Sequence, residues 1–418
     1  MSIFYRAKGF LCGWPAVGSI HLAAFFMSFY GGIYIVSLPF VVSFVGGTDK
    51  DLGLCASLGF VSYLIGCITT GPLLDRFNPR RLAQLGSLGV SVSVAALLVI
   101  VFLKLCSRNL PYPVILVIIT SVFAGLLTSL YWPPIMGWLS IGYEGRDLNR
   151  RLGVYNISWS AGLAVSPFLG GILIQSSLLA SLFVAMIFAV LAFVAITLAH
   201  PPASTRRFPI YDCRLSIVRE ESKIENRESE ISFRWMAGIA LATVFTCVGL
   251  MKTQLALLFT MELGFSKSHF GAVTAVIWLV NCIVFFAASK THLWHYKFLP
   301  LILAQLAVLG GMLIIIRSSL IISFLFVAVL MGFGQAFAYV SHQFYAASQS
   351  RNRSGSMALH EILLSAGQIM GFLAGGYLAD SFGRRAVPYW FGFSVVLIGM
   401  IVQSAMITKR PPAENSKP

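Results

Sequence analysis

The sequence predicts an all-α integral membrane protein with twelve transmembrane helices in two pseudo-symmetric six-helix bundles. Of its 418 residues, 57% are hydrophobic and 11% are charged, whereas soluble domains contain roughly 25% charged residues. Twelve apolar segments are long enough to cross a bilayer, and one long polar segment divides them six and six. A water-soluble core of this size cannot bury so much apolar surface, so we expect a lipid bilayer to cover it.

Each expected span approaches or exceeds the roughly 20 residues that a helix needs to cross the hydrocarbon core. The segments lack the alternation of a transmembrane strand, which excludes a β-barrel. The expected spans are residues 17–42, 52–74, 82–103, 113–139, 152–175, 177–199, 235–260, 268–289, 298–316, 319–345, 355–379 and 387–408.

The basic residues predict the orientation of the chain. Loops on the side of the two termini hold 22 of the 30 Lys and Arg residues, the opposite loops hold 7, and Lys252 lies within a span. Positive loops stay in the cytoplasm, so we expect cytoplasmic termini in a cell (inner or plasma) membrane. The net charge of +15 is therefore a topology signal, and we expect no nucleic-acid partner.

An internal repeat predicts two homologous bundles, residues 1–200 and 235–418, joined by a cytoplasmic linker, 201–234. At an offset of 205 residues, the 18 positions that start at Asn156 contain seven identities, among them paired glycines. Parallel repeats of this kind are common in transporters. The linker mixes both charge signs, which indicates a solvated segment rather than a regulatory domain.

A short charged stretch, residues 71–81, separates the second and third spans. Its pattern resembles the loop between helices 2 and 3 of the major facilitator superfamily, although Asn78 replaces a glycine and Pro79 is unusual. With the twelve spans, this resemblance covers essentially the whole chain and implies two bundles around a central cavity that work by alternating access. It further implies that the loop gates the cavity by contacting the start of the eleventh span at residues 354–356; the alternative is a solvated turn that only fixes topology. The gating candidates are Gly71, Asp75, Arg76, Arg80 and Arg81.

Small residues in the fifth span form a second motif, which resembles the glycine-proline motif of exporters in the same superfamily and implies an antiporter. Ser166 replaces a glycine of that motif, and plain helix packing explains the pattern equally well, because glycines let helices approach closely and proline bends them. The motif and its repeat in the eleventh span comprise Gly162, Pro167, Gly170, Gly171, Gly375 and Gly376.

Two charged residues lie inside spans, Lys252 and Glu361. A charge costs several kcal/mol in lipid, so each is expected to face the cavity or a partner. The helical rise places them roughly 16 Å apart in depth, too far for an ion pair. Glu361, with His360 beside it, is the candidate for coupling to protons; a structural contact at the gate is the alternative. Lys252 either attracts an anionic substrate or extends toward the interface.

Polar and aromatic residues on the spans that the resemblance turns inward are candidates for substrate binding, together with two buried amides. Each could instead join helices by a hydrogen bond. The substrate candidates are Tyr30, Tyr34, Tyr131, Trp132, Asn156, Lys252, Asn281, Gln335, Tyr339 and Gln343.

No phosphate loop, catalytic cluster or metal-ligand spacing is present in the sequence, so we expect no enzyme activity, no cofactor and no metal. The expected function is secondary active transport of a small organic solute by a monomer, with proton-coupled export favoured. Uptake of a metabolite by a symporter or uniporter, and a sensor or assembly factor that does not transport, are the alternatives.

Overall fold

The computed structural model describes residues 14–74, 77–106, 110–140, 145–199, 224–291, 293–347 and 353–408. In this part of the chain, twelve helical segments are long and apolar enough to cross a membrane. The predicted all-α fold with twelve spans is therefore confirmed, and the ends of the spans differ from the expected ones by a few residues.

Seven helices lie in the described residues of the first half. They are α2 (Trp14–Phe44), α3 (Asp49–Leu74), α4 (Pro79–Leu105), α5 (Pro113–Ser129), α6 (Trp132–Ser140), α7 (Gly145–Ser176) and α8 (Leu178–Leu198). The second half contains six α-helices and a short π-helix. They are α9 (Ile224–Leu257), η2 (Leu258–Glu262), α10 (Lys267–Lys290), α11 (Phe298–Arg317), α12 (Ile321–Ala347), α13 (Arg353–Phe382) and α14 (Val387–Thr408).

The fourth span is broken into α5 and α6, which the sequence analysis treated as one helix. Leu130 and Tyr131 form the turn between them, and Pro133 and Pro134 follow in the first turn of α6. Proline has no N–H group and cannot donate to a carbonyl in the preceding turn. The two prolines therefore explain why the helix is interrupted here.

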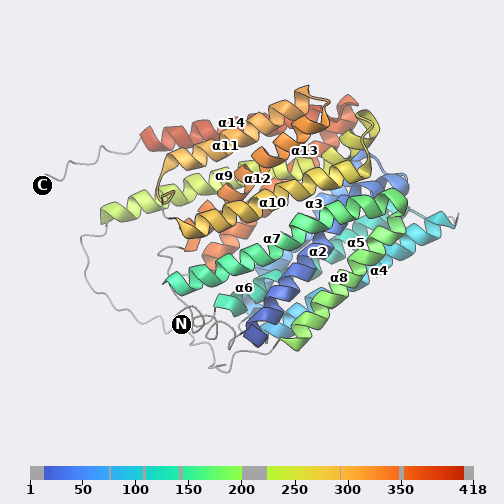
Figure 1. The fold of residues 1–418 in the computed structure, drawn as a ribbon, viewed down its shortest axis with the longest axis horizontal. Coiled ribbons are helices and arrows are strands. Elements are labelled where there is room, and N and C mark those ends of the chain that lie inside the picture. The colour runs from blue at the N-terminus through green and yellow to red at the C-terminus, as the bar shows by residue number, and fades with distance from the viewer. Residues whose placement is uncertain are drawn as a thin grey trace, which may run out of the picture.

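The helices lie side by side along the long axis of the molecule, with α2–α8 in one half and α9–α14 in the other (Figure 1). The start of α2 and the end of α14 lie at the same end (Figure 1). We call this the terminal end, and the opposite end, with the turns at residues 44–49, 262–267 and 382–387, the distal end.

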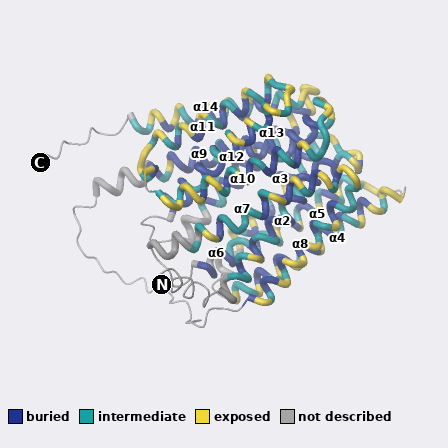
Figure 2. Tube along the Cα trace, viewed as in Figure 1, coloured by how far each residue is buried: buried dark blue, intermediate teal, exposed yellow. Residues whose placement is uncertain are grey.

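The outer surface of the bundle is apolar. Val92, Ile398 and Ile401 are each about 60% exposed, and many other large hydrophobic side chains also face outward. Buried residues concentrate inside the bundle, and exposed residues follow its outer helices and turns (Figure 2). Such a continuous apolar exterior is a surface for lipid.

The sequence repeat corresponds to equivalent contacts in the two halves. In α7, a Cβ on Gly162 would lie 2.5 Å from the carbonyl oxygen of Phe25 in α2. In α13, a Cβ on Gly367 would lie 2.3 Å from the carbonyl oxygen of Ala242 in α9. The helix pairs α2–α7 and α9–α13 are thus copies of one arrangement, as expected for two pseudo-symmetric bundles.

The two halves touch at the distal end through two close glycine pairs. A Cβ on Gly171 of α7 would lie 3.1 Å from the Cα of Gly271 in α10, and a Cβ on Gly376 of α13 would lie 3.1 Å from the Cα of Gly53 in α3. No larger residue fits at such a crossing without moving the backbones apart. Small residues therefore allow the halves to close against each other at this end.

Candidate functional site

A cavity of about 320 Å³ lies between the two halves. Its walls come from α2, α3, α5, α6 and α7 of the first half and from α9, α10, α12 and α13 of the second. The sequence analysis looked for cavity residues mainly on four spans, those of α2, α5–α6, α9 and α12. It named single residues on α7, α10 and α13, and the structure adds α3 to the wall.

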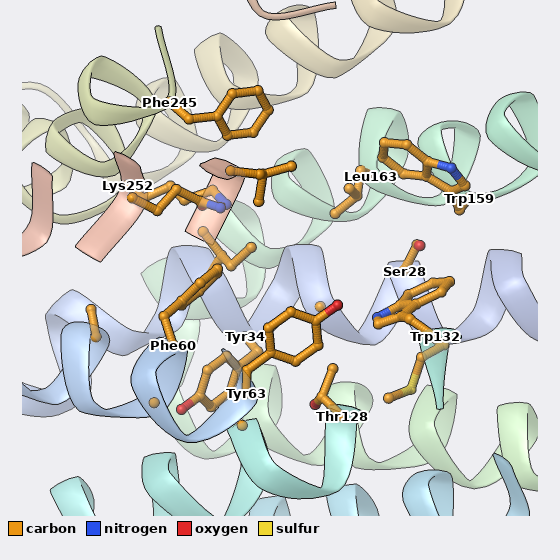
Figure 3. A pocket seen from close by; sticks show the side chains of 18 of the residues that line it. Ser28, Tyr34, Phe60, Tyr63, Thr128, Trp132, Trp159, Leu163, Phe245 and Lys252 are labelled. Atoms are coloured by element: carbon orange, nitrogen blue, oxygen red, sulfur yellow. The ribbon is translucent and has the colours of Figure 1, made fainter. Parts of the chain in front are cut away.

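Aromatic rings dominate the cavity wall. The ring of Trp159 in α7 packs against three rings of the second half. The distances between ring centroids are 6.0 Å to Trp278, 5.8 Å to Phe285 and 5.9 Å to Tyr339. Figure 3 shows Trp132 and Trp159 on one side of the cavity and Phe60 and Lys252 on the other. Rings in such edge-to-face groups offer flat apolar surfaces. The arrangement suits a ligand that itself contains rings.

Lys252 of α9 lines the cavity. Its Nζ donates a hydrogen bond to Oε1 of Gln368 (2.5 Å) and lies 5.5 Å from the ring centroid of Phe60. In the described part of the chain, no carboxylate lies within ion-pair distance of this ammonium group. Of the two expectations for Lys252, the geometry matches the cavity rather than an extension to the interface.

Glu361 of α13 also lines the cavity, and its partner comes from the other half. The hydroxyl of Tyr63 in α3 donates to Oε2 of Glu361 at 3.3 Å. Gln368 follows Glu361 by seven residues, about 10 Å along the helix. Lys252 and Glu361 therefore have different partners and occupy different positions, as the depth argument from the sequence expected.

His360 faces away from the cavity. Its Nδ1 lies 2.9 Å from Nδ1 of His342 in α12, and its ring centroid lies 4.7 Å from that of Tyr339. One of the two nitrogen atoms must donate and the other accept. The sequence grouped His360 with Glu361 because they are adjacent, but neighbouring residues on a helix point in different directions.

Asn156 and Gln343 join the two halves instead of lining the cavity. Nδ2 of Asn156 in α7 donates to Oε1 of Gln343 in α12 (3.1 Å), and Nε1 of Trp159 donates to Oδ1 of Asn156 (3.0 Å). Both amides are buried. They match the alternative stated for such residues, a hydrogen bond between helices.

Seven of the ten expected substrate residues line the cavity. Tyr131 does not, because its side chain is fully buried in the core of the first half. Asn281 lines the cavity, although its Nδ2 donates to the carbonyl oxygen of Ile277. The expected residues in the wall are Tyr30, Tyr34, Trp132, Lys252, Asn281, Gln335 and Tyr339.

The charged stretch between α3 and α4 is only partly described. Asp75 and Arg76 lie outside the described residues, and Gly71 lies in the last turns of α3. Arg80 donates from Nη2 to the carbonyl oxygen of Thr197 at the end of α8, and Arg81 is exposed. In this structure Arg80 thus contacts its own half, where a cation stabilises a helix C-terminus.

Tyr63 and Gln368 are the main cavity residues that the sequence analysis missed. Gln368 could have been predicted to line the cavity, because a residue seven positions after Glu361 lies on the same face of the helix. Nothing in the sequence indicated Tyr63, since only the crossing of α3 and α13 brings it to Glu361.

A ligand-sized cavity between two repeated six-helix halves defines a membrane transporter that works by alternating access. The chain belongs to the major facilitator superfamily, whose family model matches residues 20–341 and 295–418. It is accordingly a transporter of small molecules, and both the resemblance inferred from the sequence and the transport function are confirmed.

Relatives with described activities support this assignment. The quinolone resistance protein NorA of Staphylococcus aureus (strain MRSA252) is 21% identical over 90% of this chain and 93% of its own length. The tetracenomycin C resistance and export protein of Streptomyces glaucescens is 23% identical over 39% of this chain, a match that spans 28% of that relative.

Solved structures show the same fold. A POT family transporter in complex with a thioalcohol-conjugated peptide has a TM-score of 0.69 at 13% identity, over 94% of this chain and 96% of its own. A bacterial homologue of the lysosomal transporter Spinster, inward-facing and unoccupied, has a TM-score of 0.64 at 13% identity, over 94% and 95%.

Proposed function

We propose that this transporter exports ring-containing organic compounds from the cytoplasm in exchange for protons, as a monomer. The observation that carries the proposal is the composition of the cavity: among the described residues, its wall of aromatic rings contains one carboxyl group, Glu361, and one ammonium group, Lys252. Rings bind flat apolar surfaces with little dependence on their exact shape. The carboxyl group offers a site for a proton.

The distribution of basic residues favours a cytoplasmic location for the terminal end. The distal end then faces outward. In this structure the glycine pairs Gly53–Gly376 and Gly171–Gly271 hold the two halves together at that end. The names of the two relatives, which describe resistance and export, support movement out of the cell.

Glu361 suits coupling because it is a residue of the second half whose hydrogen-bond partner lies in the first half. Its carboxylate accepts a hydrogen bond from Tyr63 across the interface, and the two helices must separate there when the halves rock. A bare carboxylate in an apolar wall costs several kcal/mol. Loss of the Tyr63 hydrogen bond and uptake of a proton would therefore accompany each other during the cycle.

Transport into proteoliposomes tests this proposal. Purified protein is reconstituted, the lumen is made acidic, and the accumulation of a panel of fluorescent aromatic dyes is followed. We expect accumulation that requires both the protein and the pH gradient. Accumulation equal to that of protein-free liposomes, for every dye, would overturn the proposal.

The exposed tryptophan Trp235 provides a matched control for the role of the aromatic wall. Trp159→Ala removes a ring from the cavity, whereas Trp235→Ala removes a ring that is 49% exposed on the outside of α9. We expect the first variant to weaken dye binding roughly fivefold, since an aromatic contact contributes about 1 kcal/mol. The second variant should transport like the unmodified protein.

A further inference from the structure

Among the described residues, no carboxylate forms an ion pair with the ammonium group of Lys252 in the wall of the cavity. Its hydrogen-bond partner, Gln368, is neutral. The acids Asp49 and Glu262, at the distal end, are both bound to Arg385. Glu361 lies two helical turns from Gln368 and accepts a hydrogen bond from Tyr63. A cation within a membrane bundle is normally paired, and an anionic ligand in the cavity would supply a negative charge for Lys252.

Gln368 is oriented to help bind an anion. A lysine ammonium group can only donate hydrogen bonds, so the amide oxygen of Gln368 must face it. The NH₂ group of the same amide then points away from Lys252. Within the described residues, this NH₂ group has no hydrogen-bond acceptor, and Gln368 lines the cavity. Two kinds of donor, one charged and one neutral, are therefore available side by side.

Flat apolar surfaces adjoin these donors. The ring of Phe60 lies 5.5 Å from Nζ of Lys252, and the ring centroids of Phe60 and Phe372 are 5.2 Å apart. Both rings line the cavity, as does Tyr34, whose hydroxyl is bound to Ser121. A ligand with its anionic group at Lys252 would thus place its ring system against aromatic side chains.

We propose that Lys252 and Gln368 form an anion-binding subsite, and that the transported compounds are aromatic acids with a sulfonate or carboxylate group. This inference rests on the proposed function, because it assigns a substrate class to the same cavity. The anionic group accepts hydrogen bonds from Nζ of Lys252 and Nε2 of Gln368. Glu361, about 10 Å farther along α13, does not contact it.

Two ligands of the same shape but different charge test the subsite. Naphthalene-2-sulfonate is an anion, and naphthalene-2-sulfonamide is its neutral counterpart at neutral pH. Binding of each to the purified full-length protein is measured by isothermal titration calorimetry. We expect the unmodified protein to bind the sulfonate roughly tenfold more tightly or better, since a charge-assisted hydrogen bond exceeds a neutral one.

Two variants disable the subsite in different ways. Lys252→Gln removes the charge, and Gln368→Glu supplies an internal carboxylate that pairs with Lys252 in place of the ligand. Both should weaken sulfonate binding roughly ten- to hundredfold and weaken sulfonamide binding much less, since a neutral ligand loses a hydrogen bond but no charge pairing. Sulfonamide binding also shows that each variant is folded.

Lys267 provides the matched control. Its ammonium group lies 5.1 Å from the ring centroid of Phe40, a cation–π contact like that of Lys252, but it does not line the cavity. Lys267→Gln should therefore leave the affinity for both ligands unchanged.

The outcomes separate the two proposals. If the unmodified protein binds the sulfonamide but prefers it to the sulfonate, or if Lys252→Gln and Gln368→Glu retain full sulfonate affinity, the anion subsite is wrong and the aromatic cavity stands. If the unmodified protein binds neither compound, the aromatic substrate class of the proposed function fails as well.

Discussion

Arg385 and Asp49 form a two-point ion pair that joins the two halves at the distal end. Nη2 of Arg385 lies 2.9 Å from Oδ2 of Asp49, and Nε lies 3.2 Å from Oδ1. The backbone N–H of Arg385 also donates to Oε1 of Glu262 (2.9 Å). Asp49 begins α3 in the first half, whereas Glu262 and Arg385 both belong to the second half. Of the two acids, only Asp49 therefore links the halves.

Asp49→Asn should make the distal end open more often. The substitution removes the charge from the link while keeping its size, and a partly exposed ion pair contributes about 0.2–1 kcal/mol. The reporter is a cysteine introduced at Ala56, a cavity residue near the distal end, in a background without native cysteines. Its reaction with a membrane-impermeant maleimide added on the distal side should become about two- to fivefold faster.

Glu262→Gln is the control for this experiment. It removes the other carboxylate that contacts Arg385, at an Nη1–Oε1 distance of 3.6 Å, but it cuts no contact between the halves. The rate of labelling at residue 56 should stay close to that of the parent protein. Equal acceleration by both substitutions would show that Asp49 has no special role in closing the distal end.

Gly171→Ala should also open the distal end, through steric contact rather than charge. The new Cβ would lie 2.7 Å from the carbonyl oxygen of Lys267 in the other half. Backbone atoms cannot rotate away as a side chain does, so α7 and α10 must separate. Overpacking of this kind costs about 1–3 kcal/mol. We expect a lower melting temperature in detergent and faster labelling at residue 56.

Gly153→Ala tests whether any added methyl group between α7 and α10 has this effect. At Gly153 the nearest atom to a new Cβ is Cβ of Ser289, at 3.8 Å, which is an ordinary contact. The variant should therefore keep its melting temperature and its labelling rate. If it behaves like Gly171→Ala, the lower melting temperature and faster labelling of Gly171→Ala do not result from the close approach of the helices at the distal end.

Asn156 and Gln343 should show a measurable coupling energy. Their hydrogen bond crosses between the halves and is buried, and side-chain hydrogen bonds in membrane bundles contribute about 0.6 kcal/mol on average. Thermal unfolding of Asn156→Ala, Gln343→Ala and the double variant gives this coupling as the departure from additivity. Additive losses would mean that the two amides act independently.

Most of the fold could be predicted from the sequence because span length and apolarity are properties of single segments. All twelve spans are present, and even the paired glycines at 170–171 and 375–376 indicated the repeat. The break at Tyr131 was missed although Pro133 and Pro134 were visible, because the apolar run continues through it. A bilayer requires apolar side chains along the whole span, so the hydropathy of the sequence does not reveal where the helix is interrupted.

The site was less predictable, because its key contacts join residues far apart in the chain. Lys252 and Glu361 stood out, since isolated charges in apolar runs need partners. Their partners, Gln368 and Tyr63, depend on how α9 and α3 cross α13. Adjacency in the sequence does not give adjacency in the site: helix geometry turns His360 toward α12 and Glu361 toward the cavity.

Glu361→Gln should abolish the pH dependence of transport. Among the described residues that line the cavity, Glu361 is the one acid. Glutamine keeps the size of the side chain and can still accept the hydrogen bond from Tyr63, but it cannot take up or release a proton. Dye accumulation in proteoliposomes is measured over a series of lumen pH values. The parent protein should respond to pH, and the variant should give a flat profile.

Two further variants decide whether a flat profile reflects proton exchange at Glu361. Tyr63→Phe keeps the carboxyl group and removes only its hydrogen-bond donor, so the response to pH should persist. Glu262→Gln removes an acid that lies outside the cavity, at the distal end, and should also leave the response intact. Coupling at Glu361 is contradicted if its glutamine variant still responds to pH like the parent, because the proton must then bind elsewhere.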